Sequence, residues 1–255
     1  MVVSIKFLGT AAFEIRTHDG KVILIDPYLD ENPVSPYKVD DLKELDLLLV
    51  THSAYDHMGD SEKILRCFPN VPLICGADVR GYLMNRGINS KRLHASPWGM
   101  MIEKNGVKVR PVYSRHWSYI QDCNGKSFSS TPLGFIIYIN DNISVYHAGD
   151  TAIYGDMKLY GELYKPTIGL INVGVPDNHR GAKHGVSEYL SGEMNAEEAA
   201  LACEWWGLEY AIPCHHDNPE IPEIVKFTKI LEEARDYNKS SPKPIILAPG
   251  EIFEI

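Results

Sequence analysis

The chain has 255 residues, of which 44% are hydrophobic and 23% are charged, so it is large enough to bury a substantial core and too apolar for a disordered protein. Its net charge is -9 and it has no cluster of Lys and Arg, which argues against binding to nucleic acid or to an anionic membrane surface. Because it has five cysteines without a Cys-x-x-Cys pair, no signal sequence and no apolar run of roughly 18 residues, we expect a cytoplasmic protein that does not enter a membrane.

The first half of the sequence alternates apolar runs with polar turns. Short apolar runs that are typical of strands occur at residues 4–9, 12–16, 21–25, 45–50, 72–75, 100–103 and 107–113. The dipeptide Asn105-Gly106 predicts a tight hairpin between the last two of these runs. A helical turn is expected at residues 41–44, and Asp60 is expected at the N-cap of a helix. A further helix is expected at residues 77–86.

The second half repeats this alternation. Strands are expected at residues 133–139, 143–147, 167–173, 209–213 and 244–248. Helices are expected at residues 155–164 and 222–238, and a third begins at Asn195, where Glu198 would complete a capping box. The alternation in both halves indicates an α/β fold, with two sheets packed together and helices outside.

One loop of the first half concentrates side chains that bind metals. It reads Thr-His-Ser-Ala-Tyr-Asp-His-Met-Gly-Asp over residues 51–60 and directly follows the apolar run Leu-Leu-Leu-Val. His52, Asp56 and His57 therefore lie within six residues of one another, on a loop that a buried strand would hold in place. Imidazole and carboxylate donors on such a loop can bind a metal ion and still leave room for a substrate.

Three later loops carry a metal-compatible residue directly after an expected strand. His116 follows the strand at 107–113, Asp150 follows the next hairpin, and His215 follows the strand at 209–213. One such histidine would be weak evidence, because isolated histidines are more often structural. Four such loops in one chain predict that their side chains meet at one edge of the sheets.

The loop at residues 51–60 resembles the His-x-His-x-Asp-His signature of the metallo-β-lactamase superfamily, with Ala54 in place of the second histidine. Other pieces that resemble the superfamily follow in its order: Leu-Ile-Asp-Pro at 24–27, His-Ala-Gly-Asp-Thr at 147–151, Gly-Asp-Met at 155–157 and Ile-Pro-Cys-His at 212–215. They are most similar to the branch of metal-dependent hydrolases that includes L-ascorbate-6-phosphate lactonase-like proteins. The resemblance implies one domain over residues 1–255 with a four-layer αββα sandwich of the metallo-β-lactamase type.

The resemblance also implies a role for each metal-compatible side chain. The first metal would be bound by His52 and His116 and the second by Asp56, His57 and His215, with Asp150 bridging the two. A hydroxide between the metals would be the nucleophile, and Asp56 would orient it or relay its proton. Asp26 would accept a hydrogen bond from a ligand imidazole and fix its tautomer, or would only shape the turn before Pro27. The expected cofactor is one or two divalent ions, zinc first, with manganese or iron as alternatives because mixed sites accept several metals.

Ala54 removes a ligand of the first metal, because a methyl group cannot coordinate a metal ion. Three consequences are open. The second site alone could fill, since its donors suffice for a catalytic site with exchangeable water. Another side chain could substitute, and the candidates, from the segment at 177–186 or beside His215, are His179, His184 and His216. In the third case the site has decayed or has been silenced.

We therefore expect a metal-dependent hydrolase that uses a metal-bound hydroxide on a lactone, ester, amide or phosphodiester of a small polar metabolite. Arg115, Arg180 and Lys183 are candidates to contact an anionic substrate, and Trp117 is either a pocket wall or a core residue. The rivals are a non-catalytic metal-binding or sensor protein, which Ala54 favours, and a phosphodiesterase or nuclease. Nucleic-acid and membrane partners are not expected, whereas the resemblance suggests a homo-oligomer.

Overall fold

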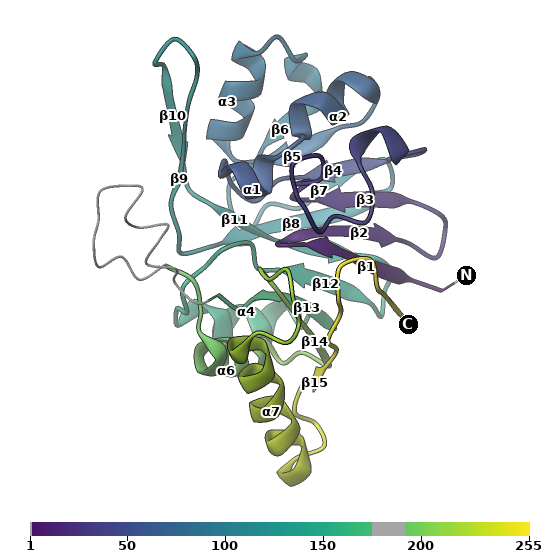
Figure 1. Ribbon diagram of the computed structural model, residues 1–255, viewed down its shortest axis with the longest axis vertical. Coiled ribbons are helices and arrows are strands. Elements are labelled where there is room, and N and C mark those ends of the chain that lie inside the picture. Colours follow the sequence, from purple (N-terminus) through teal and green to yellow (C-terminus); the bar gives the residue numbers. More distant parts are fainter. Residues whose placement is uncertain (1, 175–191) are drawn as a thin grey trace.

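The computed structural model describes residues 2–174 and 192–255. Within these residues two seven-stranded sheets pack face to face, and helices cover the outer face of each sheet (Figure 1). The architecture is the four-layer αββα sandwich that the resemblance to the metallo-β-lactamase superfamily implies.

The first sheet combines the N-terminal strands with one strand from the C-terminus. In order across the sheet, its strands are β16 (Ile252–Glu254), β1 (Ser4–Gly9), β2 (Ala12–Arg16), β3 (Val22–Ile25), β4 (Leu47–Leu49), β5 (Leu73–Cys75) and β6 (Leu93–Ala95). The helices on its outer face are α1 (Tyr55–Met58), α2 (Ser61–Cys67) and α3 (Ala77–Asn85).

The second sheet comes from the later part of the chain. In order across the sheet, its strands are β15 (Lys243–Pro244), β14 (Tyr210–Cys214), β13 (Ile168–Asn172), β12 (Ser144–His147), β11 (Leu133–Tyr138), β8 (Val107–Tyr113) and β7 (Ile102–Lys104). The helices that cover it are α4 (Asp156–Tyr164), α6 (Ala196–Trp206) and α7 (Pro222–Tyr237). A separate hairpin, formed by β9 (Ser118–Gln121) and β10 (Ser127–Ser130), projects beside α3.

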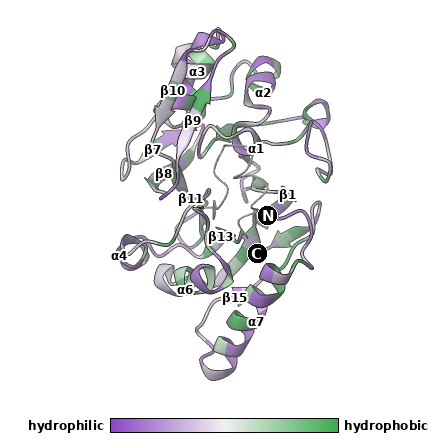
Figure 2. Ribbon diagram, turned by 60° about the vertical axis from the view of Figure 1, so that its left-hand side comes forward, coloured by the Kyte–Doolittle hydropathy of each residue, from purple (hydrophilic) through white to green (hydrophobic). Residues whose placement is uncertain are grey.

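Apolar side chains fill the three spaces between the four layers. Between the sheets, Phe7 and Phe13 of the first sheet share one buried cluster with Phe135 and Leu170 of the second. Two further clusters lie outside the sheets, and each joins one sheet to the helices on its outer face. Hydrophobic and hydrophilic residues alternate along α7 (Figure 2), as expected of a helix with one face on a sheet. Burial of this apolar surface is the main favourable contribution to folding.

The functional edge of the sandwich lies where its parallel strands end. β3 to β6 are parallel to one another in the first sheet, and β12 to β15 are parallel in the second. Backbone hydrogen bonds join the two sheets at this edge: the N–H of His215 donates to the carbonyl of Thr10 at 2.5 Å, and that of Leu133 donates to Thr51 at 3.0 Å. Ligands of α/β proteins bind at the carboxyl ends of such strands.

Most expected elements are confirmed, and the capping box of α6 is present. Oδ1 of Asn195 accepts the N–H of Glu198 at 2.9 Å, and the Glu198 carboxylate accepts the N–H of Asn195 at 3.1 Å. The helical turn expected at residues 41–44 is wrong. A 3-10 turn lies at Val39–Asp41 instead, where the Asp41 carboxylate accepts the N–H of Lys38.

Asp60 stands at the N-cap position of α2, as expected, but its side chain does not cap the helix. Its carboxylate accepts the backbone N–H groups of Leu29 and Asp30 at 2.9 and 2.8 Å, and so fixes the loop after β3. The strand expected at residues 244–248 is only Lys243–Pro244.

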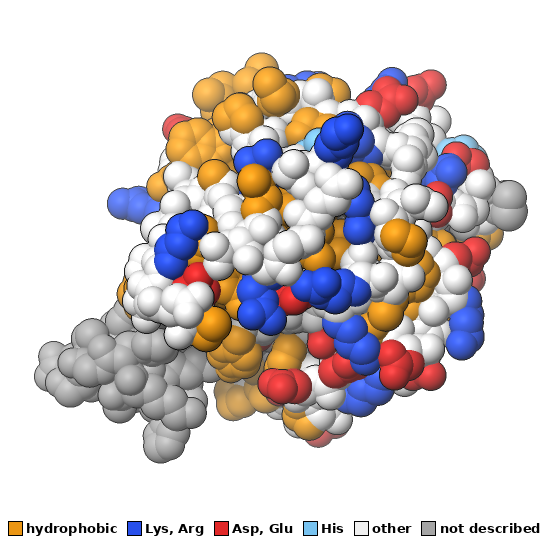
Figure 3. Space-filling model, turned by 90° about the horizontal axis from the view of Figure 1, so that it is seen from above, with side chains coloured by type: hydrophobic (Ala, Val, Ile, Leu, Met, Phe, Trp, Pro, Cys, Tyr) orange, Lys and Arg blue, Asp and Glu red, His pale blue; other side chains and the backbone are white. Residues whose placement is uncertain are grey.

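The outer surface mixes both signs of charge. Acidic and basic side chains are interspersed on the face formed by α2 and α3 (Figure 3). None of the helices in the described ranges combines the length and the apolar composition needed to cross a bilayer.

Candidate metal centre

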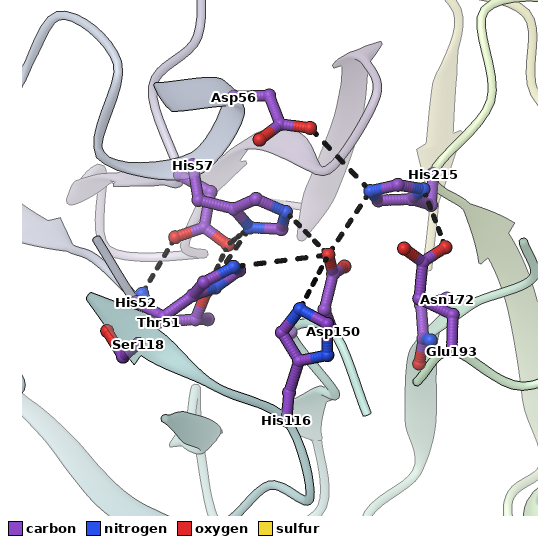
Figure 4. Close-up of polar contacts among 12 residues, drawn as sticks. Thr51, His52, Asp56, His57, His116, Ser118, Asp150, Asn172, Glu193 and His215 are labelled. Atoms are coloured by element: carbon purple, nitrogen blue, oxygen red, sulfur yellow. Dashed lines mark hydrogen bonds and ion pairs between the residues drawn. The ribbon is translucent and has the colours of Figure 1, made fainter. Parts of the chain in front are cut away.

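The loops at the functional edge bring the predicted metal-compatible side chains together (Figure 4). The loop after β4 carries three of them, and the segments after β8, β12 and β14 carry one each. All six lie in one cluster: His52, Asp56, His57, His116, Asp150 and His215.

Oδ2 of Asp150 is the centre of this cluster. Nε2 of His57 and Nε2 of His215 lie 3.2 and 3.3 Å from it. Nε2 of His52 and Nε2 of His116 lie 4.0 and 3.9 Å from the same oxygen. Donors around a tetrahedral metal with bonds of about 2.0–2.1 Å are about 3.4 Å apart. The distances to His57 and His215 match that spacing, whereas those to His52 and His116 are wider.

Two groups of the predicted donors could each hold a metal ion, and a third group, Asp150, Glu193 and His215, overlaps with both. The first group is His52, His116 and Asp150, and the second is Asp56, His57 and His215. Oδ2 of Asp56 lies 3.8 Å from Nε2 of His215. Because Asp150 also lies beside His57 and His215, its carboxylate is placed between the groups.

Several of these atoms are buried without an ordinary polar partner. The described residues provide no hydrogen bond of suitable geometry to Nε2 of His52, His57 and His215 or to Oδ1 of Asp150. A buried polar atom left unsatisfied costs about 1–3 kcal/mol. A divalent cation would coordinate lone pairs of this kind, so the donor set fits a metal.

The outer nitrogen of His57 is held by a carboxylate. Nδ1 of His57 lies 2.7 Å from Oδ2 of Asp26, and the Thr51 hydroxyl and N–H both donate to the same carboxylate, at 2.7 and 2.8 Å. A proton on Nδ1 leaves the lone pair of Nε2 facing the cluster. This is the contact expected of a residue that fixes the tautomer of a metal ligand.

His215 has the same arrangement with Glu193. Nδ1 of His215 lies 3.0 Å from Oε2 of Glu193, while its Nε2 faces Asp150. Glu193 was not among the predicted site residues. It lies just before Asn195, the N-cap of α6, where an acidic residue can be explained by its favourable interaction with the helix dipole. Glu193 contacts His215 because the residues before α6 lie beside the end of β14.

Two of the imidazoles favour the neutral form. Burial lowers the pKa of His52 well below its ordinary value, and the neighbouring His57 lowers it further. Burial also lowers the pKa of His116. Neutral imidazoles are the form that binds metals.

The other imidazoles lie where positive charge is stabilised. Burial by itself would lower the pKa of His57, but Asp150 and Asp26 outweigh it and raise the pKa well above its ordinary value. Burial likewise opposes protonation of His215, and Asp150 with Glu193 raises its pKa. Burial would raise the pKa of Asp150, whereas His215 and His57 hold it well below its usual range. The carboxylates therefore prepare this end of the cluster for positive charge, which protons or a metal ion can supply.

The backbone is strained at the same place. Asp26 and His215 adopt left-handed conformations with φ of 46° and 69°. Gly149, directly before Asp150, has φ of 61°, and a Cβ there would lie 2.9 Å from the carbonyl oxygen of Leu133. Such conformations are retained where the surrounding structure fixes them, often at functional sites.

A cleft of about 1020 Å³ opens onto the cluster. Five of the predicted ligands line it: His52, Asp56, His116, Asp150 and His215. Ala54 also lines the cleft, so the position of the missing histidine faces the space in which a ligand would lie. The first group keeps three donors without it, which is the number of protein ligands in many catalytic zinc sites.

His216, expected as a substitute ligand or as pocket lining, lies elsewhere. Its backbone forms a β-bridge with Thr10, and its ring lies 5.0 Å from the ring of Phe7. Burial lowers its pKa to about 4. It belongs neither to the metal-compatible groups nor to the cleft lining among the described residues, because pairing with Thr10 turns its ring into the core.

The other candidates divide between the cleft and the surface. Trp117 lines the cleft, which favours the pocket-wall interpretation. Arg115 is exposed and is not part of the lining, and its backbone N–H donates to the Thr151 hydroxyl. The remaining candidates lie outside the described residues: His179, Arg180, Lys183 and His184.

Comparison with known proteins agrees with this geometry. The Beta-lactamase superfamily domain matches residues 21–216. A relative from Rubrobacter xylanophilus named "UPF0173 metal-dependent hydrolase" is 34% identical over 83% of this chain and 81% of its own, and one of the same name from Methanobrevibacter smithii is 32% identical over 99% and 97%. The solved structure of Igni18, a metallo hydrolase from Ignicoccus hospitalis, aligns over 100% of this chain and 99% of its own with a TM-score of 0.76 and 26% identity. The chain therefore belongs to the β-lactamase superfamily, in one family with proteins named metal-dependent hydrolases.

Proposed function

We propose that this protein is a metal-dependent hydrolase of a small molecule, acting on a lactone, another ester or an amide. The observation that carries the proposal is the convergence of four Nε2 atoms on Oδ2 of Asp150 at the wall of a cleft. The names of the relatives support a metal-dependent hydrolase as the general class. Zinc is the proposed metal, with manganese and iron as alternatives.

The donor groups assign the residues that would hold metal ions. His52, His116 and Asp150 would hold one ion, and Asp56, His57 and His215 would hold another beside Asp150. A bound divalent cation would polarise the substrate's oxygen and lower the pKa of a water molecule. Proton transfer and the orientation of the metal-binding imidazoles would be carried out by side chains of the protein.

Asp56 is the proposed proton-transfer residue. Its carboxylate lines the cleft and lies beside His215, so it can accept a proton from the attacking water and deliver it to the leaving group. Asp26 and Glu193 keep Nδ1 of His57 and of His215 protonated, so that the opposite nitrogen of each ring stays available. The cleft positions the scissile bond against this group of donors.

The competing function is metal binding or sensing without catalysis, and Ala54 is the observation that favours it. A hydrolysis assay of the full chain separates the two. The chain would be purified without a metal-affinity tag, loaded with zinc or manganese, and assayed with 4-nitrophenyl acetate and dihydrocoumarin. We expect turnover that is lost in Asp56→Asn and in a His57→Ala, His215→Ala double variant. Metal binding with turnover no faster than that of the double variant would favour the non-catalytic protein.

A further inference from the structure

We propose that the cleft selects uncharged carbonyl substrates that carry an aromatic or extended apolar group, an inference that rests on the proposed hydrolase function. The wall of the cleft outside the metal-compatible cluster carries the argument. Its large apolar side chains come from four separate segments: Tyr28, Tyr55, Trp117, Tyr119, Ile120 and Ile221.

Three of the four aromatic side chains of this wall are exposed although they are large, and Tyr28 is partly buried. Tyr55 is 65% exposed, Trp117 55% and Tyr119 56%. Tyr28 packs edge-on against Tyr55, with 5.7 Å between the ring centres. Grouped exposed apolar side chains that border a cleft are typical of ligand-binding surfaces. An aromatic or alkyl group of a substrate would cover them.

The part of the wall that contains Trp117 and Tyr119 is anchored to the loop after β4. The hydroxyl of Ser118 accepts the N–H of Ser53 at 3.0 Å and donates to the carboxylate of Asp78. Ser118 is buried, and it lies between Trp117 and Tyr119 in the chain. The backbone that carries the two aromatic side chains is therefore anchored beside the loop that carries His52.

The charge of the lining disfavours anionic substrates. The described lining residues include Asp30, Glu31, Asp60 and Glu193 but no Lys and no Arg. Asp30 is paired with Lys63 at 2.8 Å, whereas Glu31 forms no ion pair within the described residues. The described lining thus offers carboxylates but no Lys or Arg to an anionic group, which favours a neutral ester, lactone or amide.

The reaction that fits this cleft is hydrolysis of a neutral ester or lactone. Water adds to the carbonyl carbon, the bond between that carbon and the leaving oxygen breaks, and the products are a carboxylate, an alcohol and a proton. The apolar group would lie against the wall formed by Tyr55, Trp117 and Tyr119 while the carbonyl faces Asp150. A phosphorylated sugar lactone would instead place its charge among carboxylates.

The test compares two substrates that differ by one anionic sulfonate group. These are 2-naphthyl acetate and its 6-sulfonate, assayed with the zinc-loaded full chain, and binding of 2-naphthol and 2-naphthol-6-sulfonate is measured in parallel by fluorescence. We expect kcat/KM to be about tenfold or more higher for the neutral ester. We expect Trp117→Ala to raise KM for it about tenfold, while Tyr237→Ala, an exposed aromatic on α7, changes nothing.

The two readouts separate this inference from the proposed function. If neither ester is hydrolysed but neutral naphthol binds more tightly and Trp117→Ala weakens that binding, the cleft inference stands and the hydrolase function fails. If the sulfonated compounds are preferred in turnover and binding, the inference is overturned while the hydrolase function stands. The inference is also overturned if Trp117→Ala and the unaltered chain have the same KM for 2-naphthyl acetate and bind 2-naphthol equally tightly.

Discussion

Oε2 of Glu193 lies 3.0 Å from Nδ1 of His215, and this pair repeats the arrangement of Asp26 with His57 on the other side of the cluster. In each pair a carboxylate holds the outer nitrogen of a buried imidazole. The inner nitrogens then lie 3.2 and 3.3 Å from the same oxygen of Asp150. Asp26 and Glu193 thus orient two imidazoles toward the same oxygen of Asp150, where a cation can bind.

Removal of the Glu193 carboxylate should weaken metal binding without unfolding the protein. We expect Glu193→Ala to lower zinc affinity about 10- to 100-fold, because His215 loses the group that fixes its tautomer. Glu193→Gln should keep most of the affinity, since its amide oxygen can accept the same hydrogen bond. The measurement is competition with a chromogenic chelator. Glu198→Ala, which removes one of the two hydrogen bonds of the α6 capping box, is the matched control and should lower stability by about 1 kcal/mol with metal affinity unchanged. Equal zinc affinity in Glu193→Ala and the unaltered chain would show that Glu193 is not a positioning residue.

Removal of the Asp26 carboxylate should lower both metal affinity and stability. Its carboxylate contacts His57 and also accepts two hydrogen bonds from Thr51, in a fully buried setting. We expect Asp26→Asn to lower zinc affinity by about 10- to 100-fold and also to lower the melting temperature, because buried hydrogen bonds to a charged group contribute about 1.5–3 kcal/mol each. Asp46→Asn, which removes a carboxylate that binds the Val22 N–H far from the cluster, should change stability alone. Retained zinc affinity in Asp26→Asn would restrict Asp26 to a structural role in the turn.

Restoring the missing imidazole should strengthen the weaker metal site. Ala54 faces the cleft, and the first donor group holds three ligands without it. We expect Ala54→His to tighten the binding of the weaker ion by about tenfold or more, the scale on which even outer partners of a site act. Isothermal titration calorimetry with zinc resolves binding to the stronger site from binding to the weaker site. Ala54→Leu adds bulk without a donor and should bind no more tightly than the unaltered chain. If both variants bind alike, the position of residue 54 does not reach the metal.

Metal loading should stabilise the fold. Ions that bind only the native state add about 2.7 kcal/mol when their free concentration is 100 times Kd. We therefore expect a higher melting temperature after zinc loading and a return to the lower value after chelation, as measured by differential scanning calorimetry. A His57→Ala, His215→Ala variant should show no increase. An equal increase in this variant would place the stabilising ion outside the cluster.

The elements that the sequence predicts well are those with local causes. The capping box of Asn195 and Glu198 spans three residues, and the Asn105-Gly106 turn needs only the left-handed backbone that those two residues adopt. Asp60 shows the opposite case. It has the spacing of a helix cap, yet its carboxylate binds backbone groups about thirty residues earlier, which no local pattern reveals. The β9–β10 hairpin also escaped prediction, because Ser-Tyr-Ile-Gln and Ser-Phe-Ser-Ser lack a sustained apolar run.

The candidate site divides in the same way. Histidine and aspartate residues directly after apolar strands can be recognised in the sequence, and parallel strands carry them to one edge. The contact of Glu193 with His215 depends on how a distant segment returns to the sheet, so sequence spacing does not predict it. The choice between His215 and His216 depends on the β-bridge to Thr10, which directs the two neighbouring rings to different places.

The most direct test of the account is the metal content of the chain, measured by elemental mass spectrometry after loading with zinc and exhaustive dialysis. We predict one or two ions per chain, loss of these ions in Asp150→Ala, and full retention in His216→Ala, whose ring lies outside the cluster. Circular dichroism of each variant checks that the fold is intact. An unaltered chain that retains no ion, or an Asp150→Ala variant with the full complement, would contradict the assignment of this cluster as a metal centre.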